Sequence, residues 1–174
     1  ENRSDVPKVG PVSEGEVYGV IHVPKWGEMR NVLAQGTQPW VLDQGFAGHY
    51  EGTQQLGEVG NFAVAGHRRT YGSNFRRLDI LEEGDPVVIE TKEAWYVYKV
   101  TGSEIVFPSQ GEVLLPVPND PGAEATKRLM TMTTCHPEYG NSERLILYLE
   151  FDYWSPIDGC APEPLSHRAA VTPE

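Results

Sequence analysis

The sequence contains no run of 18 or more apolar residues, so no segment is expected to span a membrane as a helix. No secretory signal peptide precedes the domain, and the first residue is Glu1 rather than Met. We therefore expect a trimmed or processed fragment, which leaves room for an upstream membrane anchor.

Cysteine is scarce, with Cys135 and Cys160 as the only two. Two cysteines without a C-x-x-C spacing argue against a disulfide framework, a thioredoxin-like site and a zinc ribbon. Basic residues are also in the minority: the chain has 14 Lys and Arg and 25 Asp and Glu, for a net charge of −11. A chain without a basic face is not expected to bind nucleic acid, or an anionic bilayer by charge alone.

Glycine and proline are abundant, at 18 and 14 in 174 residues, which predicts many turns and a β-rich fold rather than long helices. The length fits one domain that closes its own core. Residues 1–15 are polar and lack periodicity, so they are expected to form a leader. The domain is expected over residues 16–154, and a Pro-rich C-terminal tail over residues 155–174.

Short runs of β-branched and aromatic residues predict six to eight strands. They lie at 16–24, 30–36, 59–67, 86–91, 94–107, 127–135 and 144–154. Residues 74–85 have near-helical spacing and predict one or two helical turns, and residues 108–126 predict a long loop. Many strands with almost no helix predict an all-β barrel or sandwich, and periodicity alone leaves that choice open.

Cys135 ends a Thr-rich strand, where a side chain can emerge at the edge of the sheet. A catalytic cysteine reacts as the thiolate and needs a base or a cation nearby. Arg144 opens the next strand, so a short hairpin would bring it beside Cys135, and His67 ends another apolar strand. Each residue also has a plain structural interpretation: an inert buried thiol, a solvated charge and a hydrogen-bonded histidine.

The sequence motifs around these residues are more specific than the residues taken singly. Thr131-Met132-Thr133-Thr134-Cys135 resembles the T-L-x-T-C signature of sortases, with Met in place of Leu, and Arg144 follows at the family's distance. Residues 60–68 (GNFAVAGHR) resemble the sortase strand that carries the family's histidine. Gly48-His49-Tyr50 and the F-x-x-L…G-D arrangement over residues 75–85 also match. The resemblance extends from about Glu16 to Tyr153.

Within the family, the Thr-Cys-His-Pro sequence and residues 65–72 most resemble class E sortases of high-GC Gram-positive bacteria, with class D second. The resemblance implies a single eight-stranded sortase β-barrel with short helices and long loops, and a cysteine transpeptidase with Cys135 as nucleophile, His67 as proton-transfer partner and Arg144 steadying substrate and oxyanion. No metal and no cofactor are expected.

The class E resemblance implies cleavage of an L-A-x-T-G-like sorting signal between Thr and Gly through a thioacyl-enzyme. The acceptor is then an amine of a peptidoglycan precursor, so that surface proteins become attached to the cell wall. It also implies an extracytoplasmic, membrane-anchored domain, which we expect to be a monomer.

Four further residues are candidates for substrate binding. His49 and Tyr50 are expected to line the signal pocket, with Tyr50 donating a hydrogen bond to the substrate, although a surface loop pair is an equal alternative. Asn61 and Thr134 are candidate orienting groups, against simple ladder or turn hydrogen bonding. Cys160 is expected to be a free tail thiol; the alternative is a redox latch with Cys135, which requires Cα atoms within about 7 Å.

Competing interpretations remain open at this point. A class D or other sortase would prefer a different, L-P-x-T-G-like signal, and a non-enzymatic β-barrel binding module is the alternative of another class. Papain-like proteases have Cys before His, and L,D-transpeptidases carry an S-x-G-C-R sequence that is absent. A metal site using Cys135, His136 and His49 lacks tight ligand spacing and would consume the thiolate.

Overall fold

The computed structural model describes residues 3–68, 75–136 and 142–167. Eight strands form a closed barrel in the order β1-β2-β3-β4-β7-β8-β6-β5. Their bounds are β1 Val17–His22, β2 Arg30–Gln35, β3 Ala47–His49, β4 Gly60–Ala65, β5 Pro86–Thr91, β6 Ala94–Val106, β7 Arg128–His136 and β8 Glu143–Pro156. The expected eight-stranded barrel is thus confirmed, and the sandwich alternative is wrong.

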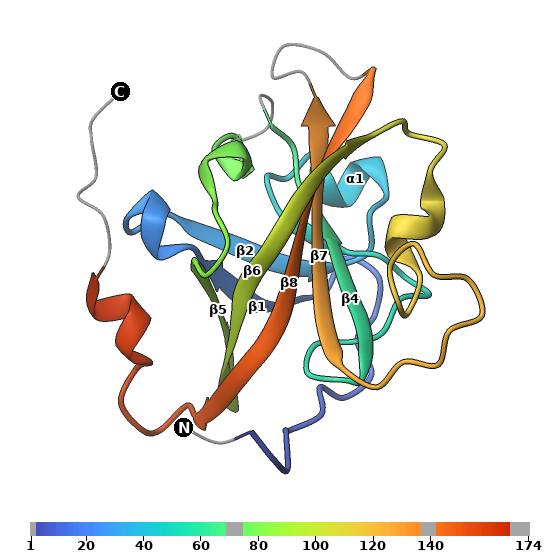
Figure 1. Ribbon diagram of the computed structural model, residues 1–174. Helices are drawn as coiled ribbons and strands as arrows, with labels where there is room; N and C mark the ends of the chain where they lie inside the picture. Colours follow the sequence, from blue (N-terminus) through green and yellow to red (C-terminus); the bar gives the residue numbers. More distant parts are fainter. Residues whose placement is uncertain (1–2, 69–74, 137–141, 168–174) are drawn as a thin grey trace.

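Helices are short and lie outside the strands (Figure 1). They are α1 Pro39–Leu42 and the 3-10 helices η1 Pro24–Trp26, η2 Leu78–Ile80, η3 Gly111–Leu114 and η4 Glu163–His167. The helical turns expected over residues 74–85 are reduced in the described part to η2. Helix η3 interrupts the long loop between β6 and β7.

Strand pairing is antiparallel except between β2 and β3 and between β4 and β7, which are parallel. The parallel β4/β7 pair joins segments far apart in the sequence, with Asn61 level with Leu129 and Ala65 level with Thr133. The long β8 then pairs with β7 on one side and with β6 on the other. These three ladders bring β4, β7 and β8 together as one continuous part of the barrel wall.

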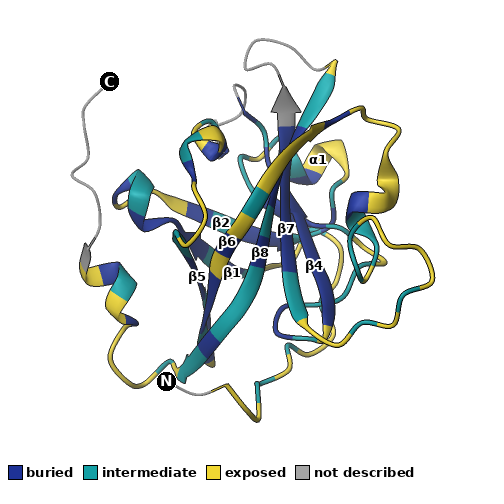
Figure 2. Ribbon diagram, viewed as in Figure 1, coloured by how far each residue is buried: buried dark blue, intermediate teal, exposed yellow. Residues whose placement is uncertain are grey.

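The barrel interior is filled by alternate side chains of these strands, because successive residues of a strand point to opposite faces. Phe62 and Val64 of β4 and Met130 and Met132 of β7 are fully buried in the main core cluster. Figure 2 shows this buried centre in dark blue along β4, β7 and β8. The intervening positions 61, 63 and 65 of β4 and 131 and 133 of β7 therefore belong to the outer face.

Residues 3–16 lie along one end of the barrel (Figure 1). The Trp154 indole donates to the carbonyl of Ser4, and the Tyr96 hydroxyl donates to the carbonyl of Pro7, each at 2.7 Å. The amide of Gly15 donates to the carbonyl of Gln35 at 2.7 Å. Desolvation raises the pKa of the Tyr96 phenol to about 12, so this hydroxyl stays a donor at neutral pH. The expected leader is therefore hydrogen-bonded to the barrel along its length.

Candidate active site

Three of the sequence-predicted residues lie in one row across the barrel wall. In the antiparallel β7/β8 ladder, Cys135 is the direct partner of Arg144. In the parallel β4/β7 ladder, Ala65 is level with Thr133, and the amide of Gly66 continues the ladder with a 3.2 Å hydrogen bond to the Thr133 carbonyl. His67 and Cys135 each follow this last pair by two residues, so both lie at the same end of the wall; we call the three positions 67, 135 and 144 the row.

The strand residues that lead to the row share one face. Positions 61, 63 and 65 of β4 and positions 131 and 133 of β7 belong to the outer series. On β8, the neighbour Leu145 belongs to the main core cluster, so Arg144 belongs to the outer series. Adjacent strands are about 4.8 Å apart, so the backbones of His67 and Arg144 lie roughly 10 Å apart with Cys135 between them.

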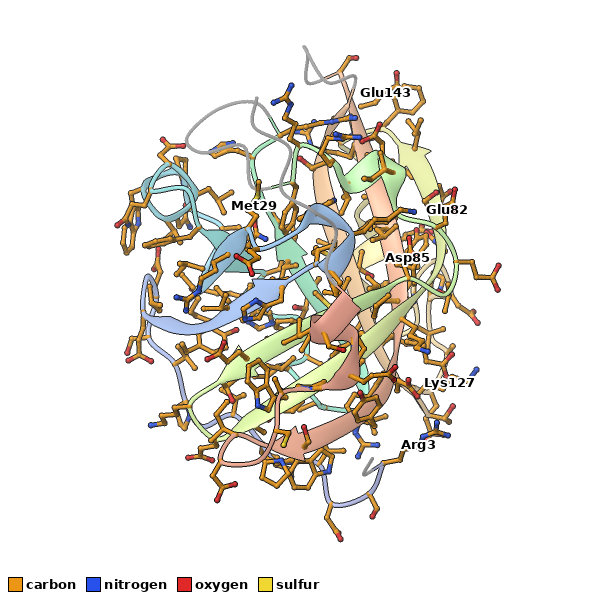
Figure 3. All side chains as sticks on the ribbon, turned by 90° about the vertical axis from the view of Figure 1, so that its left-hand side faces the viewer. Arg3, Met29, Glu82, Asp85, Lys127 and Glu143 are labelled. Atoms are coloured by element: carbon orange, nitrogen blue, oxygen red, sulfur yellow. The ribbon has the colours of Figure 1, made fainter. Side chains whose placement is uncertain are left out.

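The row lies at one end of the barrel. Glu143, the residue before Arg144, is at the opposite end of the molecule from Arg3 and Lys127 in Figure 3. Arg144 is half-buried, and its Nη1 donates to the carbonyl of Glu143 at 2.9 Å. The loop 137–141, which includes the Pro137 of the sequence motif, lies outside the described residues.

The segment that carries His67 is fixed by its neighbours. Thr134, which is buried, donates its hydroxyl to the carbonyl of Gly66 at 2.8 Å. A Cβ on Gly66 would lie 2.9 Å from the ring of Phe75, so only glycine allows this ring to pack there. The amide of Phe75 then donates to the carbonyl of His67 at 3.0 Å. Thr134 thus acts on the histidine segment through the backbone.

Asp43 was not identified from the sequence. Its Oδ1 lies 2.9 Å from Nε2 of His67, and the two side chains are 38% and 25% exposed. Asp43 directly follows α1, and its amide donates to the carbonyl of Pro39 at 2.8 Å. No motif surrounds Asp43, so the sequence offered no signal for it.

Tyr50 approaches the row from the turn after β3. Its hydroxyl lies 2.8 Å from the hydroxyl of Thr133, the outer-face residue two positions before Cys135. Its amide donates to the carbonyl of Ala63 at 2.9 Å, and its carbonyl accepts from the Thr53 hydroxyl at 2.7 Å. Tyr50 therefore crosses β4 to reach β7 beside the row.

His49 is buried beneath this turn, at 3% exposure. Its Nδ1 lies 2.8 Å from the Gln35 side-chain oxygen, and its Nε2 lies 2.9 Å from the Gln54 carbonyl and 3.0 Å from the Thr53 hydroxyl. Its ring stacks on Phe62, with centroids 5.1 Å apart. Desolvation lowers the pKa of His49 below its ordinary value, so the ring is held neutral in the fold. His49 is therefore hydrogen-bonded to Thr53 and Gln54 of the turn that follows Tyr50.

Asn61 holds the loop between β6 and β7 against the outer face. Its side-chain amide donates to the carbonyls of Val113 and Leu115, each at 3.0 Å, and its Oδ1 accepts from the Thr131 hydroxyl at 2.8 Å. Val113 also packs with Val106 and Ile146 in a small cluster on this face. Asn61 therefore ties the loop to β4 and, through Thr131, to β7.

Cys160 is free and exposed, as expected for a tail thiol. It follows β8, which runs from Arg144 at the row to Pro156 at the other end, a path of roughly 40 Å at 3.3 Å per residue. A disulfide needs Cα atoms within about 7 Å. A latch between Cys160 and Cys135 of the same chain is therefore excluded by the length of β8.

Two further properties of the described residues bear on the site. None of the helices there is long and apolar enough to cross a membrane. Within the same ranges, no three His, Cys, Asp or Glu side chains gather in a group that could hold a metal ion.

Comparison with known proteins agrees with the motifs. Residues 21–151 match the sortase domain family. Sortase SrtE1 of Streptomyces coelicolor is 36% identical over 145 residues, which are 80% of this chain and 41% of that protein. Sortase SrtE2 of the same organism is 34% identical over 159 residues, 86% of this chain and 62% of that protein. The chain thus spans less than two thirds of either curated relative.

Among solved structures, the SrtA sortase from Actinomyces oris is 50% identical, with a TM-score of 0.89 over 94% of this chain and 96% of that one. The class E resemblance expected from the sequence is confirmed by the two Streptomyces relatives. On the family match and these identities together, the chain belongs to the sortase family.

Proposed function

We propose that this chain is a sortase transpeptidase whose reacting groups are Cys135, His67 and Arg144. The observation that supports the proposal is the direct pairing of Cys135 with Arg144, beside the end of β4, whose last pair with β7, Ala65 and Thr133, precedes His67 and Cys135 by two residues each. Family membership supplies independent support. Exchange of a peptide bond without a metal needs a nucleophile, a proton donor for the leaving amine and donors for the oxyanion, and the row offers one candidate for each.

In the first half-reaction, the Cys135 thiolate attacks the Thr carbonyl of the sorting signal. The sulfur–carbon bond forms, and Arg144 with a backbone amide holds the negative charge on the oxygen. The carbon–nitrogen bond then breaks, and the His67 imidazolium gives its proton to the leaving Gly amine. The product is a thioester between Cys135 and the signal's Thr.

In the second half-reaction, an amine attacks the thioester carbon. The amine gives a proton to His67, the new amide forms, and the carbon–sulfur bond breaks to return the thiolate. We propose a peptidoglycan precursor amine as the acceptor. Water can take the same place, so slow hydrolysis of the signal is expected when no amine is present.

For the signal, we propose an L-A-x-T-G-like sequence, on the basis of the class E relatives. An L-P-x-T-G-like signal is the competing choice. We further propose that the domain works outside the cytoplasm as a monomer, with a membrane anchor upstream of residue 1. Tyr50 is proposed to contact the signal, since its hydroxyl reaches Thr133 next to the row. His49, Asn61 and Thr134 are proposed to act on the site through the elements that they hold.

The test is to incubate the protein with each signal peptide and to measure acylation of every cysteine by mass spectrometry. We expect the L-A-x-T-G peptide to add its acyl fragment to Cys135. Cys160 is a matched control, because it is an exposed thiol at the other end of the barrel. Cys135→Ala should abolish the adduct and Cys160→Ser should keep it. Unmodified Cys135 with both peptides, or cleavage by Cys135→Ala, would reject the proposal.

A further inference from the structure

The His67 ring has a carboxylate partner that the three-residue mechanism does not use. Asp43 Oδ1 lies 2.9 Å from His67 Nε2. A carboxylate at neutral pH only accepts hydrogen bonds, so the donor in this contact is the Nε2–H of His67. The proton on Nε2 is therefore held in place, and Nδ1 is the nitrogen left to exchange a proton.

We propose that Asp43 is a positioning residue that fixes the orientation and tautomer of His67, so that Nδ1 is the atom that serves the reaction. This inference rests on the proposed transpeptidase function. A carboxylate that binds one imidazole nitrogen orients the ring and stabilises the imidazolium that forms during catalysis, because a hydrogen bond between two charged groups is stronger than a neutral one.

The surroundings of Asp43 favour this role over a structural one. Among the described residues, the Asp43 carboxylate pairs with His67 and with no other side chain. The turn after α1 is closed by the backbone amide of Asp43, which needs no carboxylate. An ion pair whose members are 38% and 25% exposed adds little to the free energy of folding. Removing the charge of Asp43 should therefore change the orientation of the His67 ring more than it changes the free energy of unfolding.

The other charged groups near His67 do not replace Asp43. Arg68 is buried, and its Nη2 lies 3.7 Å from Oδ1 of Asp79, so that carboxylate already faces a guanidinium. In the row itself, the neighbour beyond Cys135 is the cation Arg144. An imidazolium near a guanidinium is disfavoured by like charge, and the negative charge of Asp43 at Nε2 offsets this repulsion.

The two ring nitrogens of His67 keep separate roles in both half-reactions. Nε2 keeps its proton and its hydrogen bond to Asp43 throughout. Nδ1 gives its proton to the leaving Gly amine and later takes one from the incoming amine, so the ring returns to its starting state. No proton passes to Asp43 in this cycle.

The kinetic test compares Asp43→Asn and Asp43→Glu with Asp158→Asn, which removes the same charge at an exposed site after β8. We expect Asp43→Asn to lower kcat about tenfold to hundredfold, a modest share of the 10²–10⁴ that acid–base groups contribute, with KM within about twofold. Asp43→Glu should recover part of kcat, and Asp158→Asn should match the parent. All three should keep the parent Tm within about 2 °C.

The spectroscopic test does not depend on turnover. Nitrogen-15 NMR of histidine-labelled protein reports which ring nitrogen carries the proton, and the His67 signals are those missing from His67→Gln. In the neutral ring, we expect the proton on Nε2 in the parent and a mixed population in Asp43→Asn. A parent ring protonated on Nδ1, or parent kcat in Asp43→Asn, would overturn the inference. A parent that acylates no signal would instead reject the proposed function.

Discussion

Cys135 and Arg144 are direct partners in the antiparallel ladder between β7 and β8, one residue from its end. Their proximity is therefore set by strand register and does not depend on the loop that joins the two strands. Because side chains alternate between faces, a slip of one residue in this ladder would turn one member of the pair to the opposite face. The buried neighbours Met132 and Leu147, which are also partners, fix the register from inside the barrel.

Arg144 is expected to need its planar guanidinium as well as its charge. Arg144→Lys keeps the charge but loses the forked donor geometry, so we expect kcat to fall about 10²–10³-fold, the usual cost of one oxyanion donor. The measurement is steady-state cleavage of the signal peptide. Arg3→Lys is the matched control, since Arg3 is 72% exposed and pairs with Asp152 far from the row. Full activity of Arg144→Lys would show that charge alone is sufficient.

The hydroxyl pair of Tyr50 and Thr133 is expected to act as a unit. Tyr50→Phe and Thr133→Val each remove one partner of the 2.8 Å contact and keep most of the side-chain volume. We expect each to lower kcat/KM about threefold to tenfold, as for loss of one hydrogen bond, and the double variant to lose less than the product. Running the cycle with Ala and Pro signals tests whether Tyr50 discriminates between them. Equal losses on both signals would exclude discrimination.

Asn61 is expected to stabilise the loop between β6 and β7. Asn61→Ala leaves the carbonyls of Val113 and Leu115 without their donor, and the Thr131 hydroxyl without its acceptor. We expect the free energy of unfolding to drop by about 1–3 kcal/mol, measured by urea denaturation. Hydrogen exchange should also become faster at residues 111–117. Unchanged exchange there would mean that Asn61 does not hold the loop.

Stability should fall in mild acid because of His49. Its pKa in the fold is lowered by burial, so between that value and the ordinary value of 6.5 the unfolded chain binds a proton that the folded chain does not. Stability from this group is therefore complete above pH 6.5 and declines as pH falls below it, by at most about 1.4 kcal/mol per pH unit.

The check on this pH effect is urea denaturation of the parent and of His49→Gln from pH 5 to 7.5. Their difference in unfolding free energy should be flat above about pH 6.5 and should shrink as the pH falls. Parallel curves across the whole range would assign the acid sensitivity to other groups.

The strands and the residues of the row could be predicted because short stretches of sequence carry the signals for both. The β-branched runs of β7 and β8 and the segments ending at His67 and Cys135 carry their own signals, and the buried face follows from alternation. The sequence also showed where the Thr residues of the signature lie. It did not show their hydrogen-bond partners, such as the Gly66 carbonyl for Thr134.

Features that depend on distant backbone escaped prediction. The strand β3 has three residues, too few for alternation to show, and it is recruited by parallel pairing with β2. Asp43 is placed by the turn after α1, so its distance to His67 depends on the packing of both elements. The leader binds through the carbonyls of Ser4 and Pro7, which every residue type possesses, and composition therefore gave no sign of docking.

The closed ring of strands also limits how an extended peptide can be held. Every strand in the described ranges has a neighbour on both sides, but β6 extends beyond β5: its ladder with β5 covers Trp95–Lys99, while residues 102–106 are paired with β8 alone. A guest strand could add to the wall only along such a short stretch, so a signal bound elsewhere must be held by side chains and loop backbone. Selectivity in such an enzyme would change through substitutions in the flanking loops, while the wall that aligns the reacting groups stays the same.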